Sequence, residues 1–187
     1  MLGRAAGFSL TEILVSITIV VILLSTAMPD LSQWREKNAT DQTIDELRGA
    51  ISMTRSSAVT YNTIVTLCRS NDGEHCQGSW NDGSIIFIDH NADHVLNGDD
   101  RLLYRTSPIS INGTITFNSF RNRQYLQMTP RGATNFQNGN FTYCPANGDL
   151  RLARQIIVSL SGRSRLARDL DGDGIAEDSQ GRPLDCD

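Results

Sequence analysis

The sequence offers little from which an enzyme active site could be built. The three histidines, His75, His90 and His94, lie in polar segments, and no motif places a serine or cysteine nucleophile near them. The four cysteines lack the Cys-x-x-Cys spacing that is typical of zinc and redox sites. We therefore expect a protein that is not an enzyme.

Aromatic residues and net positive charge are also scarce. Phenylalanine, tryptophan and tyrosine make up only 6% of the 187 residues, so the core has to be built mainly from isoleucine, leucine and valine. The net charge of −4 does not by itself indicate a nucleic-acid partner. The length suits one modest domain with an appendage.

One long apolar run lies near the N-terminus. Residues 8–28 are predominantly apolar and would span about 30 Å as a helix, the thickness of the bilayer core. An ordinary secretory signal peptide cut near Ser25–Ala27, or a plain membrane anchor with Arg4 in the cytoplasm, would explain the run. Neither needs Glu12, because a carboxylate inside an apolar span costs roughly 2.5–3.5 kcal/mol. Glu12 therefore indicates a functional partner for its charge.

Residues 7–12 (GFSLTE), followed by the apolar run, resemble the class III signal of type IV pilins and pseudopilins. The resemblance implies that a prepilin peptidase cuts after Gly7 and methylates the new N-terminal residue, Phe8. It also implies that Glu12 neutralises the N-terminal amine of a neighbouring subunit in a filament, which would make a buried carboxylate tolerable. Pro29, just past the run, matches the family as well.

Past residue 28 the apolar residues recur at three- and four-residue steps, which predicts an amphipathic helix as far as residue 61. Asn62 is typical of a helix end. The apolar positions are Leu31, Trp34, Ile44, Leu47, Ile51 and Ala58. The expected parts are a leader at 1–7, a transmembrane and filament-core helix at 8–28, its amphipathic continuation at 29–61, and a periplasmic antiparallel β domain with an Asp-rich C-terminal tail at 62–187.

The remainder of the chain predicts short strands separated by turn formers, and hence an α+β fold with a long helix packed on small antiparallel sheets. Asn112-Gly113 lies between two β-branched segments and predicts a two-residue hairpin. The expected strands are 63–68, 84–89, 101–105, 109–111, 114–117, 125–128, 141–144 and 156–160.

Several features resemble the GspH/FimT branch of the pilin family, which includes FimT and FimU minor pilins and secretion pseudopilins. They are the Cys68 to Cys76 loop, residues 80–89 leading into an Asp/Asn-rich turn, residues 101–103, and residues 156–165. The resemblance implies a helical spine with two small antiparallel sheets.

The same resemblance implies a minor pilin that takes part in assembly of a type IV pilus. Its partners would be other pilins or pseudopilins, prepilin peptidase and the bacterial inner membrane, which it would cross once before joining the filament. One alternative is a GspH-like pseudopilin of a type II secretion system. An alternative from another class is a secreted calcium-binding module with an ordinary signal peptide.

The even number of cysteines predicts disulfides if the domain lies outside the cytoplasm, whereas free buried thiols are the alternative. Three pairings are possible, and we favour Cys68–Cys76 with Cys144–Cys186. The first would close a short polar loop, and the second would tie the tail to the domain. Each would contribute about 2–4 kcal/mol.

Basic residues gather towards the C-terminus. Residues 162–165 (GRSR) resemble a Gly-Arg-x-Arg motif that FimT-type minor pilins of naturally competent bacteria use in binding DNA. In a strand, Arg163 and Arg165 would point to one face, about 7 Å apart, which matches successive phosphates along one nucleic-acid strand and suggests double-stranded DNA as a partner. Arg168 would extend this site. A charged edge strand that discourages aggregation is the alternative.

Two segments have the oxygen spacing of a calcium loop. Residues 89–100 place Asp or Asn at the ligand offsets of an EF-hand loop, but His94 stands where the loop needs glycine. Residues 169–180 have that glycine, with Gln180 where a bidentate glutamate would be. A weak Ca²⁺ site is therefore expected in this second loop, and a solvated acidic tail is the alternative. Its ligands would be Asp169, Asp171, Asp173 and Glu177.

Overall fold

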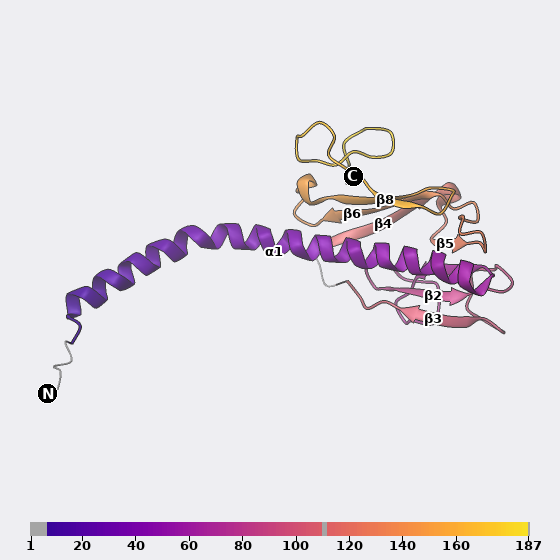
Figure 1. Cartoon of the computed structure of the whole chain (residues 1–187), viewed down its shortest axis with the longest axis horizontal. Helices are drawn as coiled ribbons and strands as arrows, with labels where there is room; N and C mark the ends of the chain where they lie inside the picture. The colour runs from indigo at the N-terminus through magenta and orange to yellow at the C-terminus, as the bar shows by residue number, and fades with distance from the viewer. Residues whose placement is uncertain (1–6, 110–111, 187) are drawn as a thin grey trace. The chain divides into compact units, whose positions relative to one another are not determined.

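The computed structural model describes residues 7–109 and 112–186, and within these it leaves out the side chains of residues 26–33. The chain forms two compact units, Met1–Ala39 and Thr40–Asp187. One helix, α1 (Leu10–Tyr61), contributes to both (Figure 1). The two segments expected at 8–28 and 29–61 are thus a single helix, and the backbone at Pro29 is helical as well.

The first unit holds the beginning of α1. Ser9 precedes the helix, and its side-chain hydroxyl accepts a hydrogen bond from the backbone N–H of Glu12 at 3.3 Å. The backbone carbonyl of Ser9 accepts from Glu12 and Ile13. A serine in this position satisfies N–H groups that the first helical turn leaves without partners.

The second unit packs the remainder of α1 against β strands. Ile44, Leu47, Ile51 and Ala58 are buried, as their three- and four-residue spacing predicts. Trp34, counted in the same apolar stripe, is instead 61% exposed and lies in the first unit. The helix ends where Asn62 adopts a φ of 51°, a left-handed conformation that asparagine tolerates at helix ends.

Two four-stranded antiparallel sheets form the β domain (Figure 1). The first has the order β3-β2-β1-β5, with strands β1 (Val65–Arg69), β2 (Ser84–Ile88), β3 (Arg101–Arg105) and β5 (Tyr125–Met128). The second has the order β4-β6-β7-β8, with strands β4 (Gly113–Ser119), β6 (Gly139–Pro145), β7 (Arg154–Val158) and β8 (Ser164–Leu166). Two short 3₁₀ turns, η1 (Phe120–Asn122) and η2 (Leu150–Leu152), complete the described elements.

One hydrophobic core joins α1 to both sheets. Ile51 of α1 is in the same buried cluster as Leu67 and Leu126 of the first sheet and Phe141 of the second. Trp80 closes the cluster, with its ring edge-on to Phe141 at a centroid distance of 4.8 Å. The expected α+β fold, a helix packed on small antiparallel sheets, is therefore confirmed.

Gly113, which the sequence predicts in a two-residue hairpin turn, is the first residue of a strand. Gly113 begins β4 and pairs with Pro145 of β6, so the strand finds its partner far along the chain. β4 can lie this close to β6 only with glycine at position 113, because a Cβ there would overlap the ring of Tyr143 and the carbonyl of Cys144. Ile109 lies outside any strand, and residues 110–111 are outside the described part.

Candidate functional site

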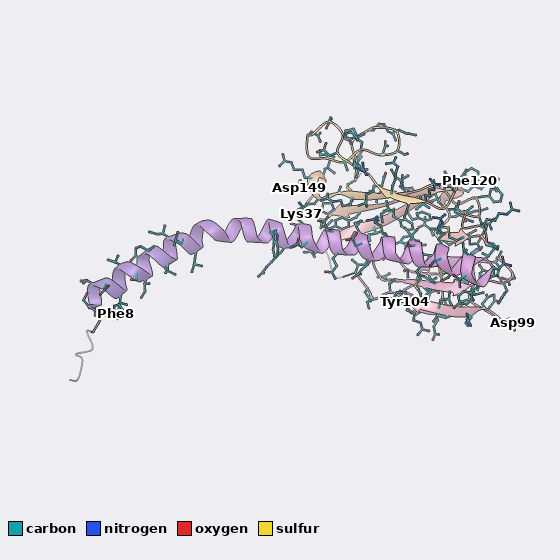
Figure 2. All side chains as sticks on the ribbon, viewed as in Figure 1. Phe8, Lys37, Asp99, Tyr104, Phe120 and Asp149 are labelled. Atoms are coloured by element: carbon teal, nitrogen blue, oxygen red, sulfur yellow. A yellow bond between two sulfur atoms is a disulfide. The ribbon has the colours of Figure 1, made fainter. Side chains whose placement is uncertain are left out.

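The N-terminal part of α1 carries exposed apolar side chains around its whole circumference. Phe8, labelled in Figure 2, precedes the helix and is 80% exposed, and the exposed fractions within the helix range from 51% at Ile13 to 77% at Leu10. Six successive residues, 19–24, are all apolar and all at least half exposed. A helix that is apolar on every side is normally covered by other apolar groups.

The hydroxyl groups of this segment are satisfied by the helix itself. Ser16 donates to the carbonyl of Glu12 at 2.7 Å, and Thr18 donates to that of Leu14 at 2.8 Å. Ser25 donates to the carbonyl of Ile22 at 2.8 Å. The carboxylate of Glu12 differs, since it is exposed and forms no hydrogen bond or ion pair with any described residue.

Within residues 7–109 and 112–186, no helical segment combines the length and the apolarity that a membrane crossing requires.

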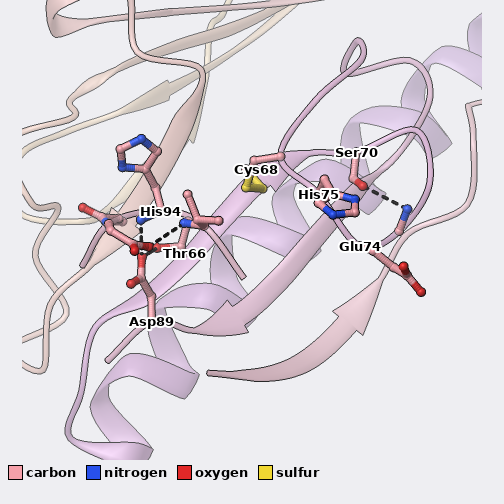
Figure 3. The surroundings of a disulfide bond; sticks show 12 residues. Thr66, Cys68, Ser70, Glu74, His75, Asp89 and His94 are labelled. Atoms are coloured by element: carbon pink, nitrogen blue, oxygen red, sulfur yellow. Dashed lines mark hydrogen bonds between the residues drawn. A yellow bond between two sulfur atoms is a disulfide. The ribbon is translucent and has the colours of Figure 1, made fainter. Parts of the chain in front are cut away.

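Both disulfides have the pairing that we favoured from the sequence. Cys68 is bonded to Cys76 across a separation of 8 residues, and Cys144 to Cys186 across 42 (Figure 3 for the first). Cys68 is fully buried in β1 beside Ile85 and Phe87 of β2. The second bond joins β6 to the tail, where Leu184 is also buried.

The loop closed by the first disulfide contains a pair of ionisable side chains. Asp72 lies 2.7 Å from the imidazole nitrogen Nδ1 of His75, and its carboxylate also accepts hydrogen bonds from the N–H groups of Glu74 and His75. Those two N–H groups and the imidazole hold the pKa of Asp72 well below its usual range. The carboxylate in turn raises the pKa of His75 above 6.5.

The arginines lie at the edge of the second sheet. In the β7–β8 pairing Arg165 is opposite Ile157. Ile156, the residue next to Ile157 in β7, is fully buried and therefore points to the opposite, inner face. Arg165 therefore lies on the outer face of the sheet. Arg163 precedes β8 and its carbonyl accepts from the N–H of Ser159, so the hairpin extends to it and the alternation places it on the same face.

The glycine of the Gly-Arg-x-Arg segment has a structural role that the sequence did not reveal. Gly162 has a φ of 74°, and a Cβ on it would overlap the backbone carbonyl of Gly132. Gly132 is held in turn by Arg55 of α1, whose Nε donates to its carbonyl at 2.9 Å. The hairpin that presents Arg163 and Arg165 is thus fixed against α1 through two glycines.

The guanidinium groups of this edge are exposed but have acidic neighbours. Arg163, Arg165 and Arg168 are all exposed, and none forms an ion pair with a described residue. Arg165 and Arg168 line a surface cavity of about 780 Å³ together with Glu177 and Asp178. The positive potential of the edge is therefore reduced on the side of the tail.

The tail brings three of its four candidate calcium ligands together. Carboxylate oxygens of Asp169, Asp171 and Glu177 lie within 4.8 Å of one another, and Asp173 is not in this group. Both oxygens of Asp169 accept backbone N–H groups, from Gly172 and Gly174. Oxygen Oε2 of Glu177 accepts from Leu170 at 2.8 Å.

The loop between β2 and β3, whose sequence has the EF-hand spacing without the central glycine, holds a second group of carboxylates. Carboxylate oxygens of Asp89, Asp93 and Asp100 lie within 4.8 Å of one another. Asp89 is fully buried, and it contacts Thr66 of β1 and Gln127 of β5 through Oδ2. A signal for this burial was present in the sequence, since Asp89 directly follows the apolar strand β2.

Comparison with known proteins identifies the family. A family model described as "Type II transport protein GspH" matches residues 43–162, more than half of the chain. Among curated proteins, none matches significantly. Two crystal structures of the type IV minor pilin FimU of Pseudomonas aeruginosa are similar in fold. One, in space group P21, shares 18% identity at a TM-score of 0.53, covering 72% of this chain and 90% of FimU. The other, in P65, shares 19% identity at a TM-score of 0.49, covering 69% and 90%.

Proposed function

Because the chain belongs to the family of type II transport protein GspH, we propose that it is a minor pilin that takes part in assembly of a type IV pilus. Prepilin peptidase removes residues 1–7, and the mature chain starts at methylated Phe8. Residues 8–28 hold the subunit in the bacterial inner membrane as a single span, with residues 62–187 in the periplasm. The same helix then packs among the helices of other subunits in the filament.

The observation that carries this proposal is that the carboxylate of Glu12 lies within an exposed and otherwise apolar helical surface. The apolar side chains of residues 8–24 are at least half exposed, so covering them with lipid or with other helices is favourable by roughly 25 cal/mol per Å². The hydroxyls of Ser16, Thr18 and Ser25 are already satisfied inside the helix. Only Glu12 brings an unsatisfied charge into this apolar surface.

A partner for Glu12 follows from that contrast. A buried carboxylate without a partner is strongly unfavourable, whereas a paired one is tolerated. Removal of the leader would create a positively charged amine on Phe8, close to the same end of the helix. The amine of a neighbouring subunit then supplies the counter-charge, and the pair sets the axial position of one helix against the next.

A neutral variant tests this role. In Glu12→Gln, we expect normal leader removal but loss of incorporation into filaments, measured by immunoblotting of sheared filaments against whole cells. Glu46→Gln is the matched control, because Glu46 is exposed on the same helix and, among the described residues, its carboxylate accepts a hydrogen bond only from Gln42. Incorporation of Glu12→Gln at the level of the control would refute the proposed pairing.

A pseudopilin of a type II secretion system is the second candidate, favoured by the match to the family of type II transport protein GspH. Residues 8–28 and Glu12 would act in the same way, with other pseudopilins as partners. A deletion strain distinguishes the two, since loss of twitching with normal protein secretion supports the pilus. Loss of secretion with normal twitching supports the secretion system.

Binding of double-stranded DNA is a further candidate, favoured by Arg163 and Arg165 on one exposed face. Side chains two residues apart in a strand are about 7 Å apart, close to the phosphate spacing of one DNA strand. Such binding would not depend on base sequence. In Arg163→Ala/Arg165→Ala, the slope of log affinity against log salt should fall by about 2. The charge-matched control is Arg121→Ala/Arg123→Ala, and equal gel-shift affinities for both variants would refute the assignment.

A further inference from the structure

The loop from Asp89 to Asp100 lies between two paired strands, and its ends are therefore fixed. Asp89 follows the last residue of β2, and Asp100 precedes the first residue of β3. Asp100 accepts hydrogen bonds from the N–H groups of His90 and Asn97, which close the loop on itself.

The carboxylates in this loop have the spacing of ligands around one cation. Oxygens of Asp89, Asp93 and Asp100 all lie within 4.8 Å of one another. Two oxygens bound to one Ca²⁺ at about 2.3–2.6 Å can be no more than about 5 Å apart. Three like charges at this separation repel one another unless a cation or donor groups screen them.

One buried oxygen of Asp89 has no partner. Oxygen Oδ2 accepts from Thr66 Oγ1 at 2.6 Å, from Gln127 Nε2 at 2.9 Å and from the N–H of His94 at 3.0 Å (Figure 3 labels Thr66 and His94). Oxygen Oδ1 is buried and has no hydrogen-bond partner among the described residues. Buried polar atoms nearly always have a partner, and a carboxylate oxygen is a ligand that hard cations prefer.

The tail loop lacks this second feature. Both oxygens of Asp169 are occupied by backbone N–H groups, and Asp169 and Asp171 are exposed. Within the described residues, Asp89 is thus the one carboxylate of either cluster that combines full burial with an oxygen lacking any donor.

The histidine that replaces the expected glycine does not disturb the loop. His94 has a φ of 57°, a left-handed conformation like that of Gly174 in the tail. Its ring is stacked on Tyr125 of β5, with centroids 4.1 Å apart and an interplanar angle of 7°. The stack offsets the strain of a non-glycine residue and keeps the imidazole engaged with Tyr125.

We infer that Asp89, Asp93 and Asp100 bind one Ca²⁺ ion. The candidate ligands are all oxygens, which favours Ca²⁺ or Mg²⁺ over Zn²⁺ or copper. Ca²⁺ accepts six to eight oxygens in flexible geometry, while Mg²⁺ demands a regular octahedron and retains waters. The side-chain oxygens of Asn91 and Asn97 are the next candidate ligands. The amide nitrogens of both residues donate to Asp93 Oδ2, and Asn91 Oδ1 also accepts from the backbone N–H of Asp93.

Ca²⁺ in this loop would join three strands. Asp89 is the first residue of the loop, and it is hydrogen-bonded to Thr66 of β1 and Gln127 of β5. The ion would connect this buried network to the start of β3 through Asp100. We therefore expect Ca²⁺ to stabilise the first sheet as well as occupy the loop.

The test uses the full chain in detergent micelles, freed of metal with a chelator and titrated with CaCl₂ by calorimetry. We expect one ion bound by this loop, weakened at least about tenfold in Asp93→Asn, because affinity follows the ligand charge. The matched control is Asp173→Asn. Asp173 Oδ1 accepts from Ile175 N–H just as Asp93 Oδ1 accepts from Val95 N–H, so the control perturbs the same kind of turn without changing binding.

Three results would overturn the inference. One is the absence of binding heat up to millimolar Ca²⁺, together with an unchanged melting temperature. Another is loss of binding in Asp171→Asn with retention in Asp93→Asn, which would place the ion in the tail. The last is MgCl₂ binding as tightly as CaCl₂. Asp89→Asn should abolish the rise in melting temperature caused by Ca²⁺, and an unchanged rise in a folded variant would equally contradict it.

Discussion

The two disulfides differ most in the length of chain that they close, and this difference predicts their contributions to stability. A cross-link stabilises mainly by restricting the unfolded chain, and the effect grows with the logarithm of loop length. The bond between Cys144 and Cys186 spans 42 residues, and that between Cys68 and Cys76 spans 8. The corresponding contributions are about 4 and about 2.5 kcal/mol at 25 °C.

Single alanine variants isolate this effect. Cys186→Ala and Cys76→Ala each remove the half-buried partner and leave the other cysteine as a thiol in its place. In Cys186→Ala the tail should stay folded, because Leu184 is buried and its N–H donates to the carbonyl of Ala176 at 2.9 Å. The loss of stability in Cys186→Ala should therefore come mainly from the greater conformational entropy of the unfolded chain.

The assay is thermal unfolding of the full chain, followed by circular dichroism in detergent. At about 2–4 °C per kcal/mol for a chain of this size, Cys186→Ala should lower Tm by about 8–16 °C and Cys76→Ala by about 5–10 °C. A larger loss in Cys76→Ala than in Cys186→Ala would refute the loop-entropy reasoning.

Three further predictions concern other parts of the second unit. Because Asp72 raises the pKa of His75, their pairing stabilises the loop below pH 6.5 and this contribution is lost as pH rises through the raised pKa. In Asp72→Asn, the pKa of His75 measured by NMR titration should therefore fall toward 6.5. Gly162→Ala should cost about 2–4 kcal/mol in chemical unfolding, from its left-handed φ and the lack of space for a Cβ. Ile51→Ala should cost about 2–5 kcal/mol because the side chain is 1% exposed, whereas Val59→Ala, at 52% exposed, should change little.

Each of these predictions has an outcome that contradicts it. An unchanged pKa of His75 in Asp72→Asn would show that the pair does not form in solution. Equal stabilities of Ile51→Ala and Val59→Ala would contradict the packing of α1 on the sheets. If Gly162→Ala were as stable as the wild type, the backbone at Gly132 would have to move aside at little cost, contrary to the prediction.

Local sequence signals predicted the elements that depend on local chemistry. The strands at 101–105 and 125–128 were placed at their observed bounds, since short segments with leucine and tyrosine are flanked there by turn formers. The end of α1 at Tyr61 was also predicted, because Asn62 tolerates the left-handed conformation that ends the helix.

Long-range packing decided what the sequence could not predict. The pairing of β4 with β6 joins residues that are far apart in the sequence, and Gly113 makes room for the ring of Tyr143. The role of Gly162 depends on the backbone of Gly132, 30 residues earlier in the numbering. In the same way, the burial of Asp89 and its oxygen without a hydrogen-bond partner among the described residues follow from the pairing of β1 with both β2 and β5.

The central claim is that the mature chain begins at Phe8 and assembles through its exposed apolar helix. The most direct test is mass spectrometry of the N-terminal peptide of the protein isolated from bacterial membranes or sheared filaments. The account predicts a peptide that starts at Phe8 and is heavier by one methyl group. A mature chain that starts at Met28, or one that retains residues 1–7, would contradict it.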